Sequence, residues 1–183
     1  MDAIECIVSR GTCRAFRPDM PEKEKIDKIV DAARYAPSGM SRFTRHFAVI
    51  TNADWLARMN ERVRTLAGDA SVKSNLERNG DKGYSCNYHS PVFVVVSADP
   101  AYPTSRDDCA CALENMFLAA HALGLATCWI NQLGHDNCDK LRDLLTEAGV
   151  PASHRVYGCC ALGYAEHAPA PRKPRTETVS YFD

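Results

Sequence analysis

A chain of 183 residues is long enough to bury a hydrophobic core within one domain. Its formal net charge of −1 argues against a protein that binds nucleic acid or membrane surfaces through a broad positive field. No run of 18 apolar residues occurs, and Asp2 and Glu5 stand where a secretory signal would be basic, so we expect a cytoplasmic protein without a membrane partner.

The cysteine pattern is typical of a reduced protein. The chain has nine cysteines, an odd number, and no Cys-x-x-Cys pair. Cys109 and Cys111 lie two apart in a predicted helix, and Cys159 and Cys160 are neighbours in a predicted strand, so the members of each pair should face different sides. We therefore expect thiols that pack as small hydrophobic side chains, with no disulfide framework and no bound metal.

The first half of the chain predicts helices separated by one strand. Acids at the start predict a short helix through about Ser9, and apolar residues at helical spacing predict an amphipathic helix over 21–35. That helix ends at the Ala-Pro-Ser-Gly sequence of 36–39. A strand is predicted over 46–50, and Asn52 can cap a second amphipathic helix.

The second half begins with a polar segment, residues 67–90, that predicts a loop with at most one short helix. The apolar run 92–99 does not alternate, which is typical of a strand covered on both faces. The segment 109–123 carries a single formal charge, Glu114, and therefore predicts a central helix. Strands over 125–131 and 155–164, a helix over 138–148 and an extended tail complete the pattern. Long helices between separated strands favour one domain, residues 1–183, with helices on both sides of a sheet.

Three arginines gather near the N-terminus of this nearly neutral chain. Arg10, Arg14 and Arg17 fall within eight positions, around the Gly-Thr-Cys sequence of 11–13. They can form a solvated turn, or they can bind an anion. In the second case the guanidinium groups and the Thr12 hydroxyl supply donors, and Gly11 lets a ligand approach the backbone.

A second basic cluster, Arg172, Lys173 and Arg175, lies near the C-terminus. A phosphate is the anion that such groups would select if the two ends of the chain meet. No Gly-x-Gly-x-x-Gly follows a strand, and the Gly-rich segment 158–163 lacks the Lys-Ser/Thr of a P-loop. A Rossmann nicotinamide domain and a P-loop nucleotidase are therefore both unexpected.

Six segments, in order, resemble the nitroreductase-like flavoproteins. They are SRGTCRAFRPDMP at 9–21, AARYAPSGM at 32–40, SPVFVVVSAD at 90–99, DCACALENMFLAAHALGLATCWI at 108–130, ALGYAE at 161–166 and PRKP at 171–174. Each segment is a weak signal by itself, whereas six in the family's order cover nearly the whole chain.

The resemblance implies a fold and an activity. The fold would be an α+β three-layer sandwich, with a central mixed, mainly antiparallel sheet flanked by helices, in an intertwined homodimer. FMN would lie at the dimer interface and pass a hydride from NADH or NADPH to a small-molecule acceptor such as a nitroaromatic or a quinone. No catalytic side chain is expected, because FMN carries the chemistry.

The resemblance also assigns residues to the cofactor. Arg10 and Thr12 would bind the phosphate, Gly11 would contribute backbone contacts, and Arg14 would lie at the pyrimidine edge and tune the flavin. The remaining implied contacts are the Ala-Pro-Ser loop of the partner subunit, the strand near Ala126, and the C-terminal basic cluster, through Pro37, Ser38, Gly39, Ser41, Thr127, Cys128, Trp129, Arg172 and Lys173.

The chain departs from the family after the Ala-Pro-Ser loop. The family continues Asn-x-Gln-Pro-Trp, and this chain has Ser-Arg-Phe-Thr-Arg at 41–45. Two alternatives therefore stay open: a specialised flavin enzyme, such as a reductive dehalogenase, an enoate reductase or a flavin-cleaving enzyme, and a non-catalytic FMN-binding protein. Tyr84 and Tyr88 are candidate stacking groups for a substrate, and a thiol sensor at Cys13 is a further alternative.

Overall fold

The computed structural model describes residues 2–134, 137–168 and 174–182, and its centre is a four-stranded sheet. The strands are β1 (His46–Ile50), β2 (Val92–Ala98), β3 (Ala126–Ile130) and β4 (Arg155–Gly163), in the order β1-β2-β4-β3. Neighbouring strands pair antiparallel throughout. The parallel component that we expected is limited, within the described ranges, to an isolated bridge between Thr12 and Thr127.

Strand β2 lies inside the sheet with both of its faces covered. All seven of its residues are buried, as the non-alternating apolar run predicted. Val94 and Val96 belong to the core cluster on one face, and Phe93 and Val95 to the cluster on the other, because successive side chains of a strand point to opposite sides. The sheet therefore separates two hydrophobic cores.

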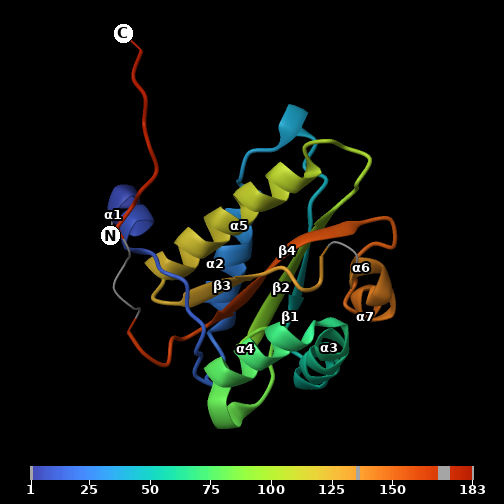
Figure 1. Ribbon diagram of the computed structural model, residues 1–183. Coiled ribbons are helices and arrows are strands. Elements are labelled where there is room, and N and C mark those ends of the chain that lie inside the picture. The colour runs from blue at the N-terminus through green and yellow to red at the C-terminus, as the bar shows by residue number, and fades with distance from the viewer. Residues whose placement is uncertain (1, 135–136, 169–173, 183) are drawn as a thin grey trace.

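One face of the sheet is covered by α2 (Lys23–Arg34) and α5 (Ser105–Ala122) (Figure 1). Leu113 and Met116 of α5 are fully buried against the sheet, which confirms that this weakly charged helix is central. The short helix α1 (Ala3–Ser9) contacts α5, where the Cys6 thiol donates to the Leu118 carbonyl at 3.3 Å.

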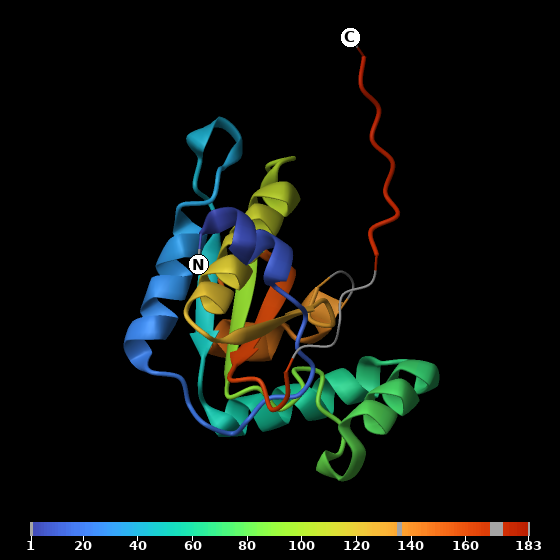
Figure 2. The ribbon, with the colours of Figure 1, turned by 90° about the vertical axis from the view of Figure 1, so that its left-hand side faces the viewer.

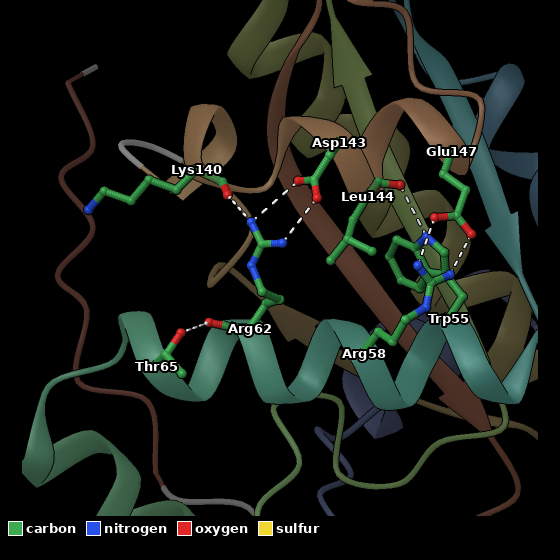
Figure 3. A network of polar contacts seen from close by, with 8 residues as sticks. All are labelled: Trp55, Arg58, Arg62, Thr65, Lys140, Asp143, Leu144 and Glu147. Atoms are coloured by element: carbon green, nitrogen blue, oxygen red, sulfur yellow. Dashed lines mark hydrogen bonds and ion pairs between the residues drawn. The ribbon is translucent and has the colours of Figure 1, made fainter.

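The other face is covered by α3 (Ala53–Leu66), α6 (Asn137–Lys140) and α7 (Arg142–Glu147). Figure 3 shows how α3 is fastened to α7: Trp55 Nε1 donates to the Leu144 carbonyl at 3.1 Å, and Arg58 and Arg62 pair with acids of α7. The single helix expected over 138–148 is interrupted, because the buried Leu141 has φ −111°, outside the helical range.

The segment 67–90 was expected to be mainly a loop, and it forms a longer helix than predicted, α4 (Asp69–Asn79), followed by the 3₁₀ turn η2 (Gly80–Lys82). Its one fully buried side chain is polar: Asn75 donates to the Ser85 carbonyl at 2.9 Å and accepts from the Ser85 amide at 3.0 Å. The helix thus lacks the apolar stripe that periodicity detects. Figure 2 shows α3 and α4 extending together at one end of the molecule.

The last described residues, 174–182, form no helix or strand and run away from the body of the molecule (Figures 1 and 2). This confirms the predicted extended tail. Its side chains Val179, Tyr181 and Phe182 are 72%, 88% and 104% exposed. No helix within the described part of the chain has the length and apolar character needed to span a membrane.

Candidate functional site

The arginine-rich segment after α1 is held between two strands of the sheet. The Cys13 amide donates to the Thr127 carbonyl on β3, and the Arg17 amide donates to the Tyr164 carbonyl just beyond β4, both at 2.9 Å. Phe16 is 2% exposed and anchors the segment in the core. Backbone bonds therefore fix residues 10–17 along the edge of the sheet.

A pocket of about 520 Å³ lies beside this segment, a volume ordinary for a small-molecule site. Five of the residues singled out from the sequence line it: Arg10, Gly11, Thr12, Arg14 and Thr127. They come from the N-terminal segment and from β3, which are more than 100 residues apart in the chain and adjacent in the fold. Two guanidinium groups and a hydroxyl thus share one pocket, as an anion site requires.

Arg10 places a buried donor in this site. Its side chain is 23% exposed, and its Nε lies 3.6 Å from Glu114 Oε1, which is too far for a hydrogen bond. Within the described ranges, Arg10 Nε is buried and has no hydrogen-bond partner. A buried charged donor without an acceptor is costly, so this site has the chemistry of an anion-binding site.

Two residues of the pocket were not found from the sequence. Arg78 reaches it from α4, and its Nη1 donates to the Tyr88 hydroxyl at 3.2 Å. His121 reaches it from the last turn of α5, with Nε2 2.8 Å from Ser9 Oγ. Arg78 lies in the segment expected to be a loop, and the chain has six histidines without a local motif that singles out His121, so only the fold reveals their placement.

The two tyrosines of the polar segment have different surroundings. Tyr88 is beside the pocket through its contact with Arg78, whose guanidinium carbon lies 5.9 Å from the centre of the Tyr88 ring. Tyr84 packs partly buried against the core, and burial raises the pKa of its phenol to about 12. Substrate stacking by either ring stays a prediction.

The Ala-Pro-Ser loop is held elsewhere, at the start of α5. Asp108, 7% exposed, accepts from Ser38 Oγ at 2.8 Å and from the Gly39 amide at 2.9 Å. Ser41 continues this loop with φ 52°. Asp108 precedes His121 by 13 residues on one helix, a separation of about 20 Å along its axis. The loop that contains Pro37, Ser38, Gly39 and Ser41 is therefore held at the start of α5, whereas the arginine pocket includes His121 at the end of that helix. Figure 1 shows the course of α5.

A match to a known family's sequence model covers residues 7–164 and carries the description nitroreductase family. The chain belongs to the nitroreductase family. Its fold agrees with solved structures of that family over their full length. A Bacteroides fragilis nitroreductase with bound FMN is 38% identical, with a TM-score of 0.88 and complete coverage of both chains. A Desulfitobacterium hafniense nitroreductase with bound FMN is 27% identical, with a TM-score of 0.89 and the same coverage.

A curated relative from the archaeon Methanothermobacter thermautotrophicus is named "Putative NADH dehydrogenase/NAD(P)H nitroreductase". It is 28% identical over 177 residues, which is 94% of this chain and 82% of the relative. The six segments that resembled the family in the sequence thus led to the correct assignment.

Cys128 and Trp129, which were also expected at the cofactor, do not line the arginine pocket. Cys128 is buried in the core, which raises the pKa of its thiol to about 11. Trp129 is 37% exposed and faces away from Cys128, with Nε1 donating to Asn131 Oδ1 at 2.5 Å. Arg172 and Lys173 lie outside the described residues.

The cysteines are distributed between buried and exposed positions as free thiols. All nine cysteines are free, and no group of three metal-ligating side chains occurs within the described ranges. Cys109 is buried and Cys111 exposed, and Cys159 and Cys160 belong to opposite cores, as their spacing predicted. Burial raises the pKa of the Cys13 thiol, which disfavours the reactive thiolate that a sensor requires.

Proposed function

We propose that this nitroreductase-family protein is an FMN-dependent oxidoreductase that uses NADH or NADPH to reduce a small acceptor such as a nitroaromatic or a quinone. Family membership, the FMN bound in two similar structures and the name of the archaeal relative support the reaction class. The observation that carries the proposal is the buried Arg10 Nε, without a hydrogen-bond partner among the described residues, beside a pocket of the right size.

The residues of the pocket fit a flavin phosphate. Arg10 and Thr12 supply donors for phosphate oxygens, and Gly11 leaves room beside the backbone. Arg14 and Arg78 add positive charge to the same pocket, which would favour the reduced, more negative flavin over the oxidised form. Bound FMN would supply the hydride chemistry, and this chain would bind it, orient it and set the surrounding charge.

We propose further that the site is completed by a second copy of the chain. The Pro37–Ser41 loop is held at Asp108, about 20 Å along α5 from His121 of the arginine pocket, which favours the loop of a partner as the one that reaches the FMN of this pocket. Apolar side chains also remain exposed on α1, where Ile4, Ile7 and Val8 are 69%, 49% and 58% exposed. A homodimer would cover such surface. Light scattering during gel filtration should give about twice 20.2 kDa.

The cofactor can be identified before any activity is assumed. The purified protein should be yellow, and acid release followed by mass spectrometry should yield FMN. Anaerobic addition of NADH or NADPH should then bleach the flavin absorbance. A protein that stays colourless after dialysis against excess FMN would contradict the proposal.

The two alternatives make different predictions in the same experiment. A non-catalytic FMN-binding protein keeps its colour with either nicotinamide donor. It remains a candidate because the segment 41–45 departs from the family, and two of its residues, Ser41 and Phe43, have positive φ values of 52° and 51°. A specialised flavin enzyme, such as a reductive dehalogenase or an enoate reductase, would be reduced but would discriminate sharply among nitroaromatic, halogenated and enoate acceptors.

The cytoplasmic location stays a proposal.

A further inference from the structure

His121 occupies a position in the pocket that the proposed function does not yet use. It lies in the last turn of α5 and lines the pocket together with Arg10, Gly11 and Gly124. Its Nε2 is 2.8 Å from Ser9 Oγ, at the end of α1. The imidazole is thus tied on one side to α1, and among the described residues its other nitrogen, Nδ1, has no hydrogen bond.

The hydrogen bonds of Ser9 define which nitrogen of His121 carries the proton. Ser9 Oγ donates its hydrogen to the Glu5 carbonyl at 2.6 Å. It therefore accepts from His121, and Nε2 is the protonated nitrogen. In the neutral ring Nδ1 then carries a lone pair, which repels an anion. Protonation of Nδ1 turns the same atom into a charge-assisted donor.

Other charged and titratable groups share the pocket with His121. Arg10, Arg14, Arg78 and His167 line it, contributed by the N-terminal segment, by α4 and by the segment after β4. Three features of α5 and α1 offset part of the positive charge.

The carboxylate of Glu114, on α5 itself, lies 3.6 Å from Arg10 and offsets part of its charge. The C-terminal end of α5 also favours a cation in its last turn. On α1, Glu5 contributes its backbone carbonyl to the Ser9 bond, and its exposed side chain adds a weak negative charge. A dianionic phosphate would reverse the balance of the pocket and draw a proton onto Nδ1.

We propose that His121 is an additional ligand of the FMN phosphate, and that FMN binding takes up one proton from solvent at Nδ1. The N–H formed there donates to a phosphate oxygen while Nε2–H stays bonded to Ser9 Oγ. This inference rests on the proposed function, because it assigns a further residue to the same cofactor. The proposal predicts that the affinity for FMN depends on pH, because His121 can gain or lose a proton whereas the arginines of the pocket stay charged.

The test measures the dissociation constant of FMN by flavin fluorescence at pH 6.5 and pH 8.5, for the wild type and for His121→Gln. Glutamine places an amide N–H near the position of Nε2, so it retains the Ser9 bond and lacks the titrating Nδ1. The phosphate itself titrates near pH 6, but it does so equally in both proteins. Riboflavin, which has no phosphate, serves as the ligand control.

The wild type should bind FMN about ten-fold more tightly than His121→Gln at pH 6.5. At pH 8.5 the ratio of the two dissociation constants should approach one. Riboflavin should bind both proteins equally at both pH values. Calorimetry in buffers of different ionisation enthalpy should show a larger proton uptake per FMN for the wild type. His121→Lys, a permanent cation, should bind FMN tightly at both pH values.

Three results separate the inference from the function on which it rests. An affinity ratio that stays constant with pH would overturn the role of His121 while leaving the flavoprotein intact. A pH dependence that persists in His121→Gln and is lost in His167→Gln would assign the proton to the other histidine of the pocket and also overturn it. Absence of FMN binding by the wild type at any pH would remove the proposed function itself.

Discussion

Arg10 is the residue on which the cofactor proposal depends most directly. Replacing it with alanine removes the buried Nε donor and one positive charge from the pocket. Charge-assisted hydrogen bonds are worth about 2–3 kcal/mol, so the affinity for FMN should fall on the order of 30- to 100-fold in Arg10→Ala, measured by fluorescence titration.

The matched control for this prediction is Arg17→Ala. Arg17 belongs to the same segment, lies outside the pocket lining and pairs at the surface with Asp19 at 2.7 Å. Its loss should change FMN affinity by less than about two-fold. Equal losses in the two variants would mean that general positive charge, rather than the pocket, attracts the cofactor.

Gly39 illustrates a glycine that is required by space. A Cβ built at this position would lie 2.5 Å from Thr104 Oγ1 and 2.8 Å from Thr104 Cβ. Gly39→Ala should therefore destabilise the protein by about 1–3 kcal/mol in chemical denaturation. The double variant with Thr104→Gly removes all three close Thr104 atoms and should recover most of this loss, because the Thr104 side chain makes no capping bond to α5. Additive losses would contradict the steric cause.

Tyr164 links the start of α2 to the end of β4 through a pH-sensitive contact. Its hydroxyl donates to Glu22 Oε2 at 2.6 Å, and this bond, with the help of Lys25, lowers the pKa of Glu22 to about 2. A carboxylate whose folded pKa is depressed stabilises the fold above its unfolded pKa and loses that contribution as pH falls through the folded value.

Tyr164→Phe should consequently lower the melting temperature at pH 7. The difference from the wild type should shrink as the pH falls from about 4.5 toward 2, where Glu22 becomes protonated. A thermal denaturation series across this range measures it. A difference that is constant with pH would show that lost ring packing, and not the carboxylate contact, causes the change.

At the scale of whole elements, helices α3 and α7 are joined by a buried hydrogen bond and by exposed ion pairs (Figure 3). Trp55 is 3% exposed, and its Nε1 bonds the Leu144 carbonyl inside the core. Trp55→Phe removes this bond and part of a buried ring system, leaving the carbonyl with only the Ala148 amide at 3.0 Å. It should cost about 1–3 kcal/mol of unfolding free energy, measured by chemical denaturation.

The exposed ion pair between the same helices provides a comparison for the stability contributed by the buried hydrogen bond. Arg62 pairs with Asp143 at 3.0 Å on the same two helices, and both side chains are largely in solvent. Arg62→Ala should cost less than about 1 kcal/mol, because exposed ion pairs contribute little. If Arg62→Ala were the more destabilising variant, surface charge would hold α3 to α7.

The sequence correctly predicted the helices and strands whose apolar side chains recur at the spacing of a helix or a strand. The helix that became α2 and the buried strand β2 were read correctly because their apolar residues are arranged by burial. Helix α4 was missed because its buried contact is a polar pair between Asn75 and the Ser85 backbone. The break at Leu141 was missed because it leaves the hydrophobic pattern intact.

The same limit applies to the candidate site. The arginine segment was visible because its members are neighbours in the chain, and the structure brings Arg10 and Arg14 to one pocket. Arg78 and His121 join that pocket from α4 and α5, and no local pattern marks them. Residues that come together only through tertiary packing have no local sequence pattern. They can be predicted only where a resemblance to a known family assigns them to the site.

At the scale of the whole molecule, the chain places two sets of expected cofactor contacts at opposite ends of one rigid helix. The pocket that Arg10 lines includes His121 at the end of α5, and the loop of Ser38 is fixed to the beginning of the helix by Asp108. An 18-residue helix packed against a sheet does not bend to close such a distance. Each chain thus carries both sets of cofactor contacts, but its own two sets are too far apart to form one complete site.

Two defective chains should therefore be able to repair each other. Arg10→Ala damages one half of the site and Asp108→Ala releases the loop that forms the other, so dimers of either variant alone should reduce acceptors poorly. After the two variants are unfolded and refolded together in equal amounts, half of the dimers combine one chain of each kind. Each mixed dimer contains one undamaged site, which restores about a quarter of all sites. If the mixture were no more active than its components, each subunit would work alone.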